Sequence, residues 1–531
     1  MDDPAATLHR LTRHGSLPDP GDAPLVVFQP LDPTNRPSPF KRYLGPQPVL
    51  LPRDPWDRGP RATDVLSASP AASPDGWWDA SRLSRLLFLV NGVSRVHRSG
   101  SGETTYFRTA MSAGNLHPVE IYVVCGDLGG VPAGVHHFAP LEHGLTELRR
   151  GDHRAVLAGA AAAPEIAEAA VTLVLTGIPW RTAWKYGERG FRHLYWDAGT
   201  VLANLLAIEP LARVKMSFVD AHVAHLVGVD RVTELPLALV VLPGARPAAG
   251  AGRAAGAGQA FEPLDLPVAP MSRAPITFPL VTAAQRDGDL ADPAEVERWR
   301  AAAAAFGQPA LSGLDPPVAS PDEPIEAVIL RRGSTRLMRR DTVSADLFTW
   351  GLGVQSRAID ADFVGSDATL LEHLVTVHDV EGIDPGAFRV RADRIERGSR
   401  AQHRDVAAHL CLDQPLGGDS AFTVFHTCDI EAVLGALGSR SYRAPLLEAG
   451  VASGRLALAA FALGYGATGL TFYDDEVSHF FGTPAACMLV TAVGVPDYRN
   501  VTGSGPGAPA RLAGYDRLMH QLGLQLSRGG I

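Results

Sequence analysis

The stretch "YWDAGTVLANLLAIEPLA" (residues 195–212) has a counterpart later in the chain, "LLEAGVASGRLALAAFALG" (446–464). Each is followed by a second matched stretch, "FVDAHVAHLVGVD" (218–230) in the first copy and "FYDDEVSHFFGTP" (472–484) in the second. The order and spacing agree, apart from a few residues gained in the second copy. Such a unit is far longer than a solenoid repeat, so we interpret the sequence as a duplicated domain that folds as an intrachain pseudo-dimer.

Length and charge agree with this interpretation. A chain of 531 residues is too long for one ordinary hydrophobic core, which predicts two or more domains. The net charge of −9 argues against a nucleic-acid-binding protein, because such proteins usually carry a basic surface. The N-terminal "MDDPAATLHR" lacks the apolar core of a signal peptide, and no apolar run suggests a membrane span. We therefore expect a cytoplasmic protein.

The cysteines predict neither a metal site nor a disulfide framework. Cys125, Cys411, Cys428 and Cys487 lie far apart, without CxxC or Cys/His spacing. Cys125 and Cys487 fall inside strand-like runs and are most simply buried thiols. We expect no metal.

Apolar periodicity predicts helices and strands in both copies. A helical period begins near residue 80, and a second helix is expected from about 195 to 211. The runs 119–126, 171–177 and 235–244 are typical of strands.

Changes in composition divide the chain into five predicted segments. The first is rich in Pro, Asp and Arg, and the third is rich in Gly, Ala and Pro, with one Ala-rich helix inside it. The segments are an extended N-terminal arm (1–75), a first domain (76–245), a linker (246–320), a second domain (321–500) and a C-terminal tail (501–531).

The two copies differ at motifs that can bind a ligand. The second copy has Gly464, Gly466 and Gly469 where the first has no glycine. Glycines allow the backbone to approach a ligand closely, but a helix cap followed by a turn explains them equally well. The second copy also has "LRRGSTR" at an expected helix start. Such a segment can hold a phosphate, or it can be a solvated basic surface. Its candidate residues are Arg331, Arg332, Ser334 and Arg336.

The first copy has a different motif, "RTAMSAGNLHPVEIYVV" (108–124), without an evident counterpart in the second. Small residues there form a predicted tight turn just before a strand: Ser112, Ala113, Gly114 and Asn115. Because each copy holds motifs that the other lacks, we predict one composite site between the two copies.

Several of these motifs resemble those of a known family. "LLFLVNGVSR" and "YFRTAMSAGNLHPVEIYVV" resemble the signature of the nitroreductase-fold flavoproteins, in the branch called SagB-type azoline dehydrogenases. "WKYGERGFRHLYWDAG" resembles the Lys-Tyr-Gly-Glu-Arg block of that branch, and "RRGSTR" and "ALAAFALGYGATG" resemble nitroreductase flavin motifs. The resemblance implies an α+β fold of two tandem nitroreductase-like domains, each a central sheet flanked by helices.

The resemblance also assigns roles to residues. Lys185 and Tyr186 match the catalytic pair of the branch, and burial, or a neighbouring cation such as Arg181 or Arg189, is expected to lower the pKa of Lys185. It implies one FMN per chain. The expected FMN-binding residues are Arg108, Ser112, Ala113, Gly114, Asn115, Arg331, Arg332, Ser334, Arg336, Gly464, Gly466 and Gly469.

The implied reaction is FMN-dependent oxidation of thiazoline or oxazoline rings to thiazoles or oxazoles in a ribosomally made peptide, as in thiopeptide biosynthesis. One hydrogen leaves as a hydride to the flavin and one as a proton to a base. Dioxygen is the expected terminal acceptor. The expected partners are an azoline-containing precursor peptide and a separate cyclodehydratase, and the expected assembly is a monomeric pseudo-dimer or a higher oligomer.

Three other functions stay open at this stage. One is an NAD(P)H-dependent nitro or quinone reductase, which the Lys-Tyr block argues against. Another is a catalytically dead duplicate that serves as a peptide-binding scaffold, which the complementary motifs argue against. The third is oxidation of another peptide group, such as a Cα–Cβ bond.

Overall fold

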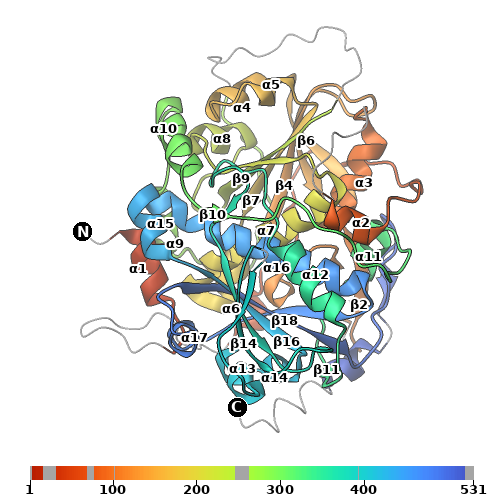
Figure 1. Cartoon of the computed structure of the whole chain (residues 1–531). Coiled ribbons are helices and arrows are strands. Elements are labelled where there is room, and N and C mark those ends of the chain that lie inside the picture. Colours follow the sequence, from red (N-terminus) through yellow and green to blue (C-terminus); the bar gives the residue numbers. More distant parts are fainter. Residues whose placement is uncertain are drawn as a thin grey trace.

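The computed structural model describes residues 3–15, 31–68, 77–100, 102–244, 262–392, 394–512 and 514–520. Within these residues, two large β-sheets lie on either side of a central helix pair, α7 (Gly190–Ile208) and α16 (Arg443–Ala462) (Figure 1). Parts of the predicted arm, linker and tail lie outside the described residues.

The first sheet has the strand order β1-β6-β5-β4-β7-β9-β8, and its six neighbouring strand pairs are antiparallel. Its central strands β4, β7 and β9 are buried along their whole length, which is why the sequence shows them as continuous apolar runs. The strands are β1 (Val49–Leu50), β4 (Val119–Cys125), β5 (Gly134–Ala139), β6 (Gly144–Arg150), β7 (Val171–Gly177), β8 (Arg213–Lys215) and β9 (Leu235–Leu242).

The second sheet repeats this arrangement. β13 pairs with β14 and β16, and β16 pairs with β18, as β4 pairs with β5 and β7, and β7 with β9. The predicted fold class, α+β with tandem domains of sheet and flanking helices, is therefore confirmed. The strands are β11 (Met338–Arg339), β13 (Glu372–Val377), β14 (Gly386–Arg391), β15 (Arg394–Arg397), β16 (Phe422–Cys428), β17 (Gly466–Leu470) and β18 (Ala486–Pro496).

The remaining elements cover the sheets or connect them. The helices are α1 (Pro4–Leu11), α2 (Ala62–Ser67), α3 (Ala80–Asn91), α4 (Arg154–Ala160), α5 (Glu165–Glu168), α6 (Pro179–Tyr186), α8 (Asp220–Val227), α9 (Pro279–Asp287), α10 (Pro293–Ala304), α11 (Ile325–Arg331), α12 (Ala345–Gln355), α13 (Arg404–Leu410), α14 (Pro415–Asp419), α15 (Ile430–Leu437) and α17 (Asp474–Phe481). The short helical turns are η1 (Pro33–Asn35), η2 (Ala113–Asn115), η3 (Gly187–Arg189) and η4 (Ser439–Tyr442). The minor strands are β2 (Val93–Arg98), β3 (Thr104–Arg108), β10 (Gln308–Pro309), β12 (Ala368–Thr369) and β19 (Ala510–Arg511).

Helix α16 is buried along its whole length. The segment Ser439–Ala462 is long and apolar enough to cross a membrane by length and composition, although the sequence suggested no such run. The whole of its apolar window is buried inside the fold. Packing against α7 and the second sheet therefore explains its composition.

Two reciprocal ion clusters join the copies. Asp474 of the second copy accepts hydrogen bonds from Arg189 (2.8 Å) and Arg192 (2.6 Å) of the first, and all three side chains are buried. This contact explains why the aspartates at the start of α8 and α17 match in the sequence. The equivalent cluster joins Asp220 to Arg440 (2.6 Å) and Arg443 (3.4 Å).

The segment 1–75, predicted as an extended arm, includes two short helices, α1 and α2, that the sequence did not predict. The Asp3 carboxylate caps α1 by accepting hydrogen bonds from two N–H groups of its first turn. The end of α1 is held by Arg192, which donates to the His9 carbonyl at 2.8 Å. Helix α1 was not predicted because it has only eight residues. The sequence around it is rich in polar residues and proline, so it shows no clear helical periodicity.

The predicted linker 246–320 also needs correction. The Ala-rich helix is present as α10. A second helix, α9, precedes α10 and buries its Val281 and Ala284 side chains in the core. Arg192 of α7 donates to a carbonyl of α1, and its counterpart Arg443 of α16 donates to the Gln285 carbonyl of α9. Helix α9 therefore makes the same contact with the second copy that α1 makes with the first.

The residues after α1 and α9 match as well. The His14 N–H donates to Asp474 at 3.0 Å, and the Leu290 N–H donates to Asp220 at 3.0 Å. Helices α1 and α9 are therefore counterparts, and the second copy begins well before residue 321.

Candidate functional site

The small-residue turn before β4 is held by a buried carboxylate on α7. The Ser112 hydroxyl donates to Asp197 at 2.5 Å, and the Ala113 N–H donates to the other carboxylate oxygen at 3.1 Å. Gly114 and Asn115 then adopt left-handed conformations, with φ of 61° and 57°. Burial raises the pKa of Asp197 to about 7, against the two hydrogen bonds. Asp197 was not among the site residues predicted from the sequence.

The second copy has a counterpart of this turn, although the sequence predicts none. Glu448 on α16 accepts a hydrogen bond from the Thr369 hydroxyl (2.6 Å) and from the Leu370 N–H (2.9 Å). Burial raises the pKa of Glu448 to about 7, as it does for Asp197. The counterpart was hidden because other residue types make the same two bonds, and because β13 begins directly after the turn without a Gly-Asn pair.

The predicted catalytic pair lies at the end of α6. The Tyr186 ring stacks on His193, with ring centroids 4.0 Å apart and an angle of 21°. A Cβ atom placed on Gly114 would lie 3.0 Å from the Tyr186 hydroxyl, so Tyr186 reaches the small-residue turn. Lys185 is exposed, with its Nζ 5.3 Å from the centre of the Tyr186 ring.

Charges from both copies act on this pair. Partial desolvation lowers the pKa of Lys185, and the guanidinium groups of Arg336 and Arg36 lower it further. Burial raises the pKa of Tyr186, and Asp197 adds to the effect, whereas Arg336 opposes it. The cations that act on Lys185 are not the expected Arg181 and Arg189, because these two arginines are bound to Glu120 and Asp474 respectively.

The arginine segment of the second copy follows a helix end and not a helix start. Arg331 is the last residue of α11, and its guanidinium pairs with Glu323 at 2.5 Å. Arg332 is buried and donates to the Thr109 carbonyl of the first copy. Arg336 differs from both, because its guanidinium forms no ion pair or hydrogen bond within the part of the chain that the structure describes. The predicted helix start at this segment is therefore wrong. Of the three arginines, Arg336 is the one whose guanidinium is available to bind a ligand.

The three glycines of the second copy have three different surroundings. Gly464, with φ of 82°, ends α16, as the helix-cap interpretation expects. Gly466 begins β17, where a Cβ atom would collide with the Thr335 hydroxyl and lie 2.7 Å from Pro496. Gly469 is exposed on β17, where a Cβ atom would make only an ordinary contact with the Val490 carbonyl at 3.9 Å.

The structure brings the motifs of the two copies together. Ser334 forms a β-bridge with Ala467, so the glycine strand lies beside the arginine segment. Met111, next to the small-residue turn, packs against the hydrophobic core of the second copy. Arg108 is the exception, because its buried guanidinium donates to the Pro39 carbonyl and holds the N-terminal segment.

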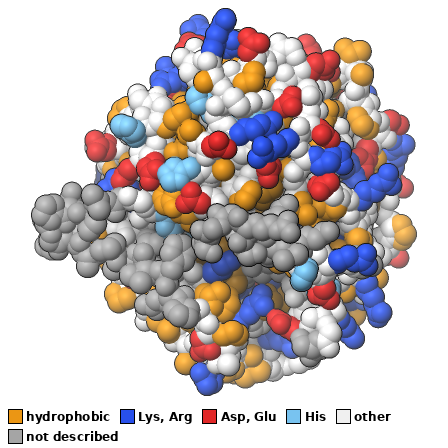
Figure 2. Space-filling view, turned by 90° about the horizontal axis from the view of Figure 1, so that it is seen from below, with side chains coloured by type: hydrophobic (Ala, Val, Ile, Leu, Met, Phe, Trp, Pro, Cys, Tyr) orange, Lys and Arg blue, Asp and Glu red, His pale blue; other side chains and the backbone are white. Residues whose placement is uncertain are grey.

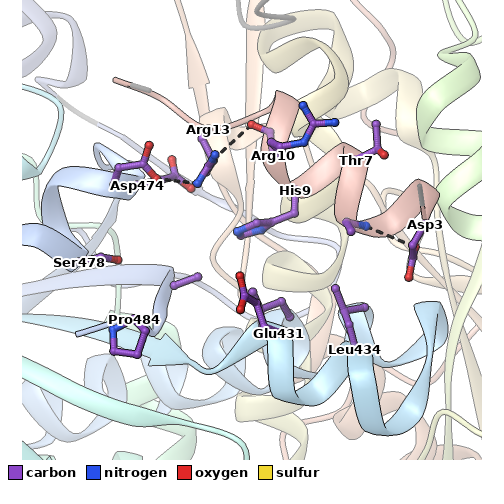
Figure 3. Close-up of a pocket in the computed structure, with 14 residues that line it drawn as sticks. Asp3, Thr7, His9, Arg10, Arg13, Glu431, Leu434, Asp474, Ser478 and Pro484 are labelled. Carbon is purple, nitrogen blue, oxygen red and sulfur yellow. Dashed lines mark hydrogen bonds and ion pairs between the residues drawn. The ribbon is translucent and has the colours of Figure 1, made fainter. Parts of the chain in front are cut away.

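Two cavities lie outside this arrangement. The first, of about 480 Å³, lies between α1, α15 and α17, and the side chains of His9 and Glu431 project into it (Figure 3). The second, of about 320 Å³, lies between the start of α6, the loop after α8 and the segment that leads into α9. Among the described residues, the predicted site residues line neither of these cavities.

The face shown in Figure 2 carries acidic, basic and hydrophobic side chains interspersed with one another. This mixture is ordinary for a protein surface, where apolar atoms make up much of the exposed area.

Comparison with known proteins identifies the family. The sequence matches none of the family models against which it was compared. A protein of Methanocaldococcus jannaschii described as a nitroreductase is 31% identical over 163 residues, which cover 30% of this chain and 77% of that protein. The chain belongs to the nitroreductase family.

Solved nitroreductases support the fold over nearly the whole chain. A nitroreductase structure from Anabaena variabilis aligns with 93% of this chain and all of that chain, at a TM-score of 0.65 and 22% identity. The Escherichia coli microcin synthetase complex with its truncated pro-peptide covers 34% of this chain at a TM-score of 0.28, which is too low to carry an argument. Nitroreductase-family proteins are flavin-dependent oxidoreductases, and this chain shares their fold.

Proposed function

We propose that this nitroreductase-family chain is a SagB-type dehydrogenase, which oxidises thiazoline or oxazoline rings to azoles in a ribosomally made peptide. The observation that carries the proposal is the position of the Lys185–Tyr186 pair. It lies beside the small-residue turn of its own copy and within the electrostatic reach of Arg336 from the other copy.

The residues of this arrangement fit FMN. Arg336 is a cation that forms no ion pair with any residue that the structure describes, so it can hold an anionic group between the copies. Arg336 would bind the phosphate, and the turn at Gly114 would approach the ring, where a larger residue would meet the Tyr186 hydroxyl. When bound, FMN supplies the acceptor for the hydride.

The protein then has to remove a proton. Lys185 must be a neutral amine to act as the base, and desolvation and the neighbouring cations increase its neutral fraction by lowering its pKa. Tyr186 stays protonated at neutral pH because its pKa is raised, so its hydroxyl can donate a hydrogen bond. The His193 ring fixes the plane of Tyr186 by stacking.

We propose that one FMN binds per chain. If Arg189 is matched to Arg440, the positions of Lys185 and Tyr186 fall on Ala436 and Leu437, which cannot supply a base. The Leu437 carbonyl accepts a hydrogen bond from the buried Trp299 indole of α10 at 3.0 Å. Strand β10 also pairs with β12, which includes Thr369 of the turn that Glu448 holds in the second copy. The second pseudo-site therefore lacks the catalytic pair and is covered by the chain itself.

The family resemblance supplies the rest of the proposal. The substrate is an azoline-containing precursor peptide, of the kind used for thiopeptides, and a separate cyclodehydratase makes its rings. Dioxygen takes the electrons from the reduced cofactor and becomes hydrogen peroxide. We propose that the reaction takes place in the cytoplasm.

The test combines cofactor content with turnover. Purified protein should hold about one FMN per chain and convert a thiazoline peptide to a thiazole, seen as the loss of two hydrogens by mass spectrometry. Lys185→Gln and Tyr186→Phe should keep the FMN but lose about 10²–10⁴-fold in kcat. Arg339→Gln, a change at an exposed arginine paired with Asp341, is the control. NADPH-driven reduction of nitro compounds or quinones without azoline oxidation would favour the reductase, and a protein that binds no FMN would favour the scaffold.

A further inference from the structure

The cavity beside α6 has the features of a binding site for an apolar group. The rings of Trp180 and Phe278 lie nearly parallel in its wall, with centroids 6.3 Å apart and an angle of 23°. At its edge, Ile276 and Val268 are 53% and 36% exposed. Its volume of about 320 Å³ is at the lower end of the range of small-molecule sites and is large enough for one aromatic side chain.

The charged side chains in the cavity wall already have partners. The buried Lys41 ammonium pairs with Glu234 at 2.7 Å, and that carboxylate also accepts a hydrogen bond from the Tyr122 hydroxyl. The Asp230 carboxylate accepts hydrogen bonds from the N–H groups of the turn that follows it. Because these are the charged side chains that line the cavity among the described residues, and each already has partners, the cavity favours an uncharged occupant.

The counterpart cavity in the other copy has the opposite character. It lies between α1, α15 and α17, which occupy the places of α9, α6 and α8 (Figure 3). Matching Arg189 to Arg440 places Glu431 where the first copy has Trp180, and Arg10 and Arg13 line the cavity as well. The apolar cavity thus belongs to the copy that carries the Lys185–Tyr186 pair.

Side-chain contacts connect the apolar cavity to that pair. Ala274, just before the cavity edge, exchanges two hydrogen bonds of 2.8 Å with the Asn35 side chain. The next residue, Arg36, lies 5.9 Å from the Trp184 ring and acts electrostatically on Lys185. Trp180 and Lys185 are five residues apart on α6, which is about 7.5 Å along a helix.

We propose that this cavity binds one large, uncharged, apolar side chain of the peptide substrate, about two residues from the ring that is oxidised, since an extended peptide spans about 3.3 Å per residue. The peptide in this statement rests on the proposed function, whereas the apolar ligand rests on the cavity alone. An aromatic side chain fits best, because the two rings in the wall can stack on it.

Binding of small probes tests the cavity without any turnover. N-acetyl-phenylalaninamide should bind to the full-length protein, and N-acetyl-aspartamide should not, as followed by ligand-observed NMR. Ile276→Asp and Val268→Asp should each weaken binding of the first probe at least about tenfold, because a charge is then placed at an apolar edge. Val318→Asp changes a fully exposed valine elsewhere and should leave the probe affinity as it is. Equal binding by all variants, or no binding at all, would overturn the proposal.

Peptide substrates test whether the occupant of the cavity is a side chain of the substrate. A thiazoline peptide with Phe two residues from the ring should have a kcat/KM at least about tenfold above that of its Asp analogue, and Ile276→Asp should remove this preference. If the protein binds the probe but oxidises no azoline, the apolar binding cavity is supported and the proposed function is wrong. If the protein oxidises azolines without any preference for Phe, the proposed function is supported and the side-chain binding site is wrong. If sedimentation shows a dimer that Ile276→Asp dissociates, the occupant is a second copy of this chain, and the proposal is wrong.

Discussion

Gly199 of α7 lies directly against Gly450 of α16, backbone to backbone. A Cβ atom on Gly199 would collide with the Leu447 carbonyl and lie 2.6 Å from the Gly450 Cα, and a Cβ atom on Gly450 would lie 2.9 Å from the Gly199 Cα. Equivalent residues of two copies meet in this way only on a twofold axis. The crossing of these helices is therefore the pseudo-twofold axis of the molecule.

Gly199→Ala and Gly450→Ala should each lower the free energy of unfolding by about 1–3 kcal/mol, because the added methyl group meets rigid backbone. Urea denaturation followed by circular dichroism measures this. Gly435→Ala is the matched control, since Gly435 lies in helix α15 with open space around it. There the helix should gain about 0.5–1 kcal/mol. Tolerance of both changes on α7 and α16 would contradict the close crossing.

The reciprocal ion clusters should also carry much of the contact between copies. Asp474→Asn leaves the buried guanidinium groups of Arg189 and Arg192 without a counter-charge, so we expect a loss of about 3–5 kcal/mol in the free energy of unfolding. Asp220→Asn should behave in the same way. Glu103→Gln breaks an exposed pair with Arg36 and should change stability by less than about 1 kcal/mol. Equal effects of the buried and exposed changes would show that the clusters do not hold the copies together.

Much of the fold was predictable because the duplicated signals are local. The apolar runs of β4, β7 and β9 and the long helix before Asp220 are continuous segments whose period survives in the sequence. The reason for the matched aspartates was not predictable, because their arginine partners come from the other copy.

The candidate site shows the same limit. Ser112 to Asn115 could be read as a turn, yet its partner Asp197 is distant in sequence and lies on a helix whose other residues belong to the core. Arg331 and Arg336 look alike in the sequence, and only their surroundings separate a paired arginine from an available one. Helices α1 and α9 were missed because short segments rich in proline carry little period.

The pKa of Asp197 should leave a signature in the pH dependence of stability. Burial raises its pKa to about 7 in the folded protein, so the protonated form stabilises the fold below about pH 4 and this contribution is lost as the pH rises through about 7. Asp197→Asn cannot ionise. The variant should be less stable than the original protein at about pH 5, where its amide satisfies the two donors poorly, and the deficit should shrink at about pH 9.

Denaturation curves at the two pH values, compared as differences between variant and original protein, provide the measurement. Glu448→Gln should show the same sign, because burial raises the pKa of Glu448 to about 7 as well. Asp384→Asn, at an exposed position, should show a difference that does not depend on pH. A deficit for Asp197→Asn that grows with pH would mean that Asp197 is ionised in the folded protein.

Cofactor affinity should separate Arg336 from the other arginines of its segment. Arg336→Gln should weaken FMN binding by about 10–100-fold, because a charge-assisted hydrogen bond to the phosphate contributes about 1.5–3 kcal/mol. Riboflavin lacks the phosphate, so its affinity should change less than about threefold in the same variant, which distinguishes a phosphate contact from a general disturbance of the site. Arg339→Gln, three residues away and exposed, is the matched control. Fluorescence titration of the apoprotein with each flavin measures both affinities. Equal losses for FMN and riboflavin would place Arg336 away from the phosphate and return that role to Arg332, whose buried guanidinium keeps one nitrogen without a partner.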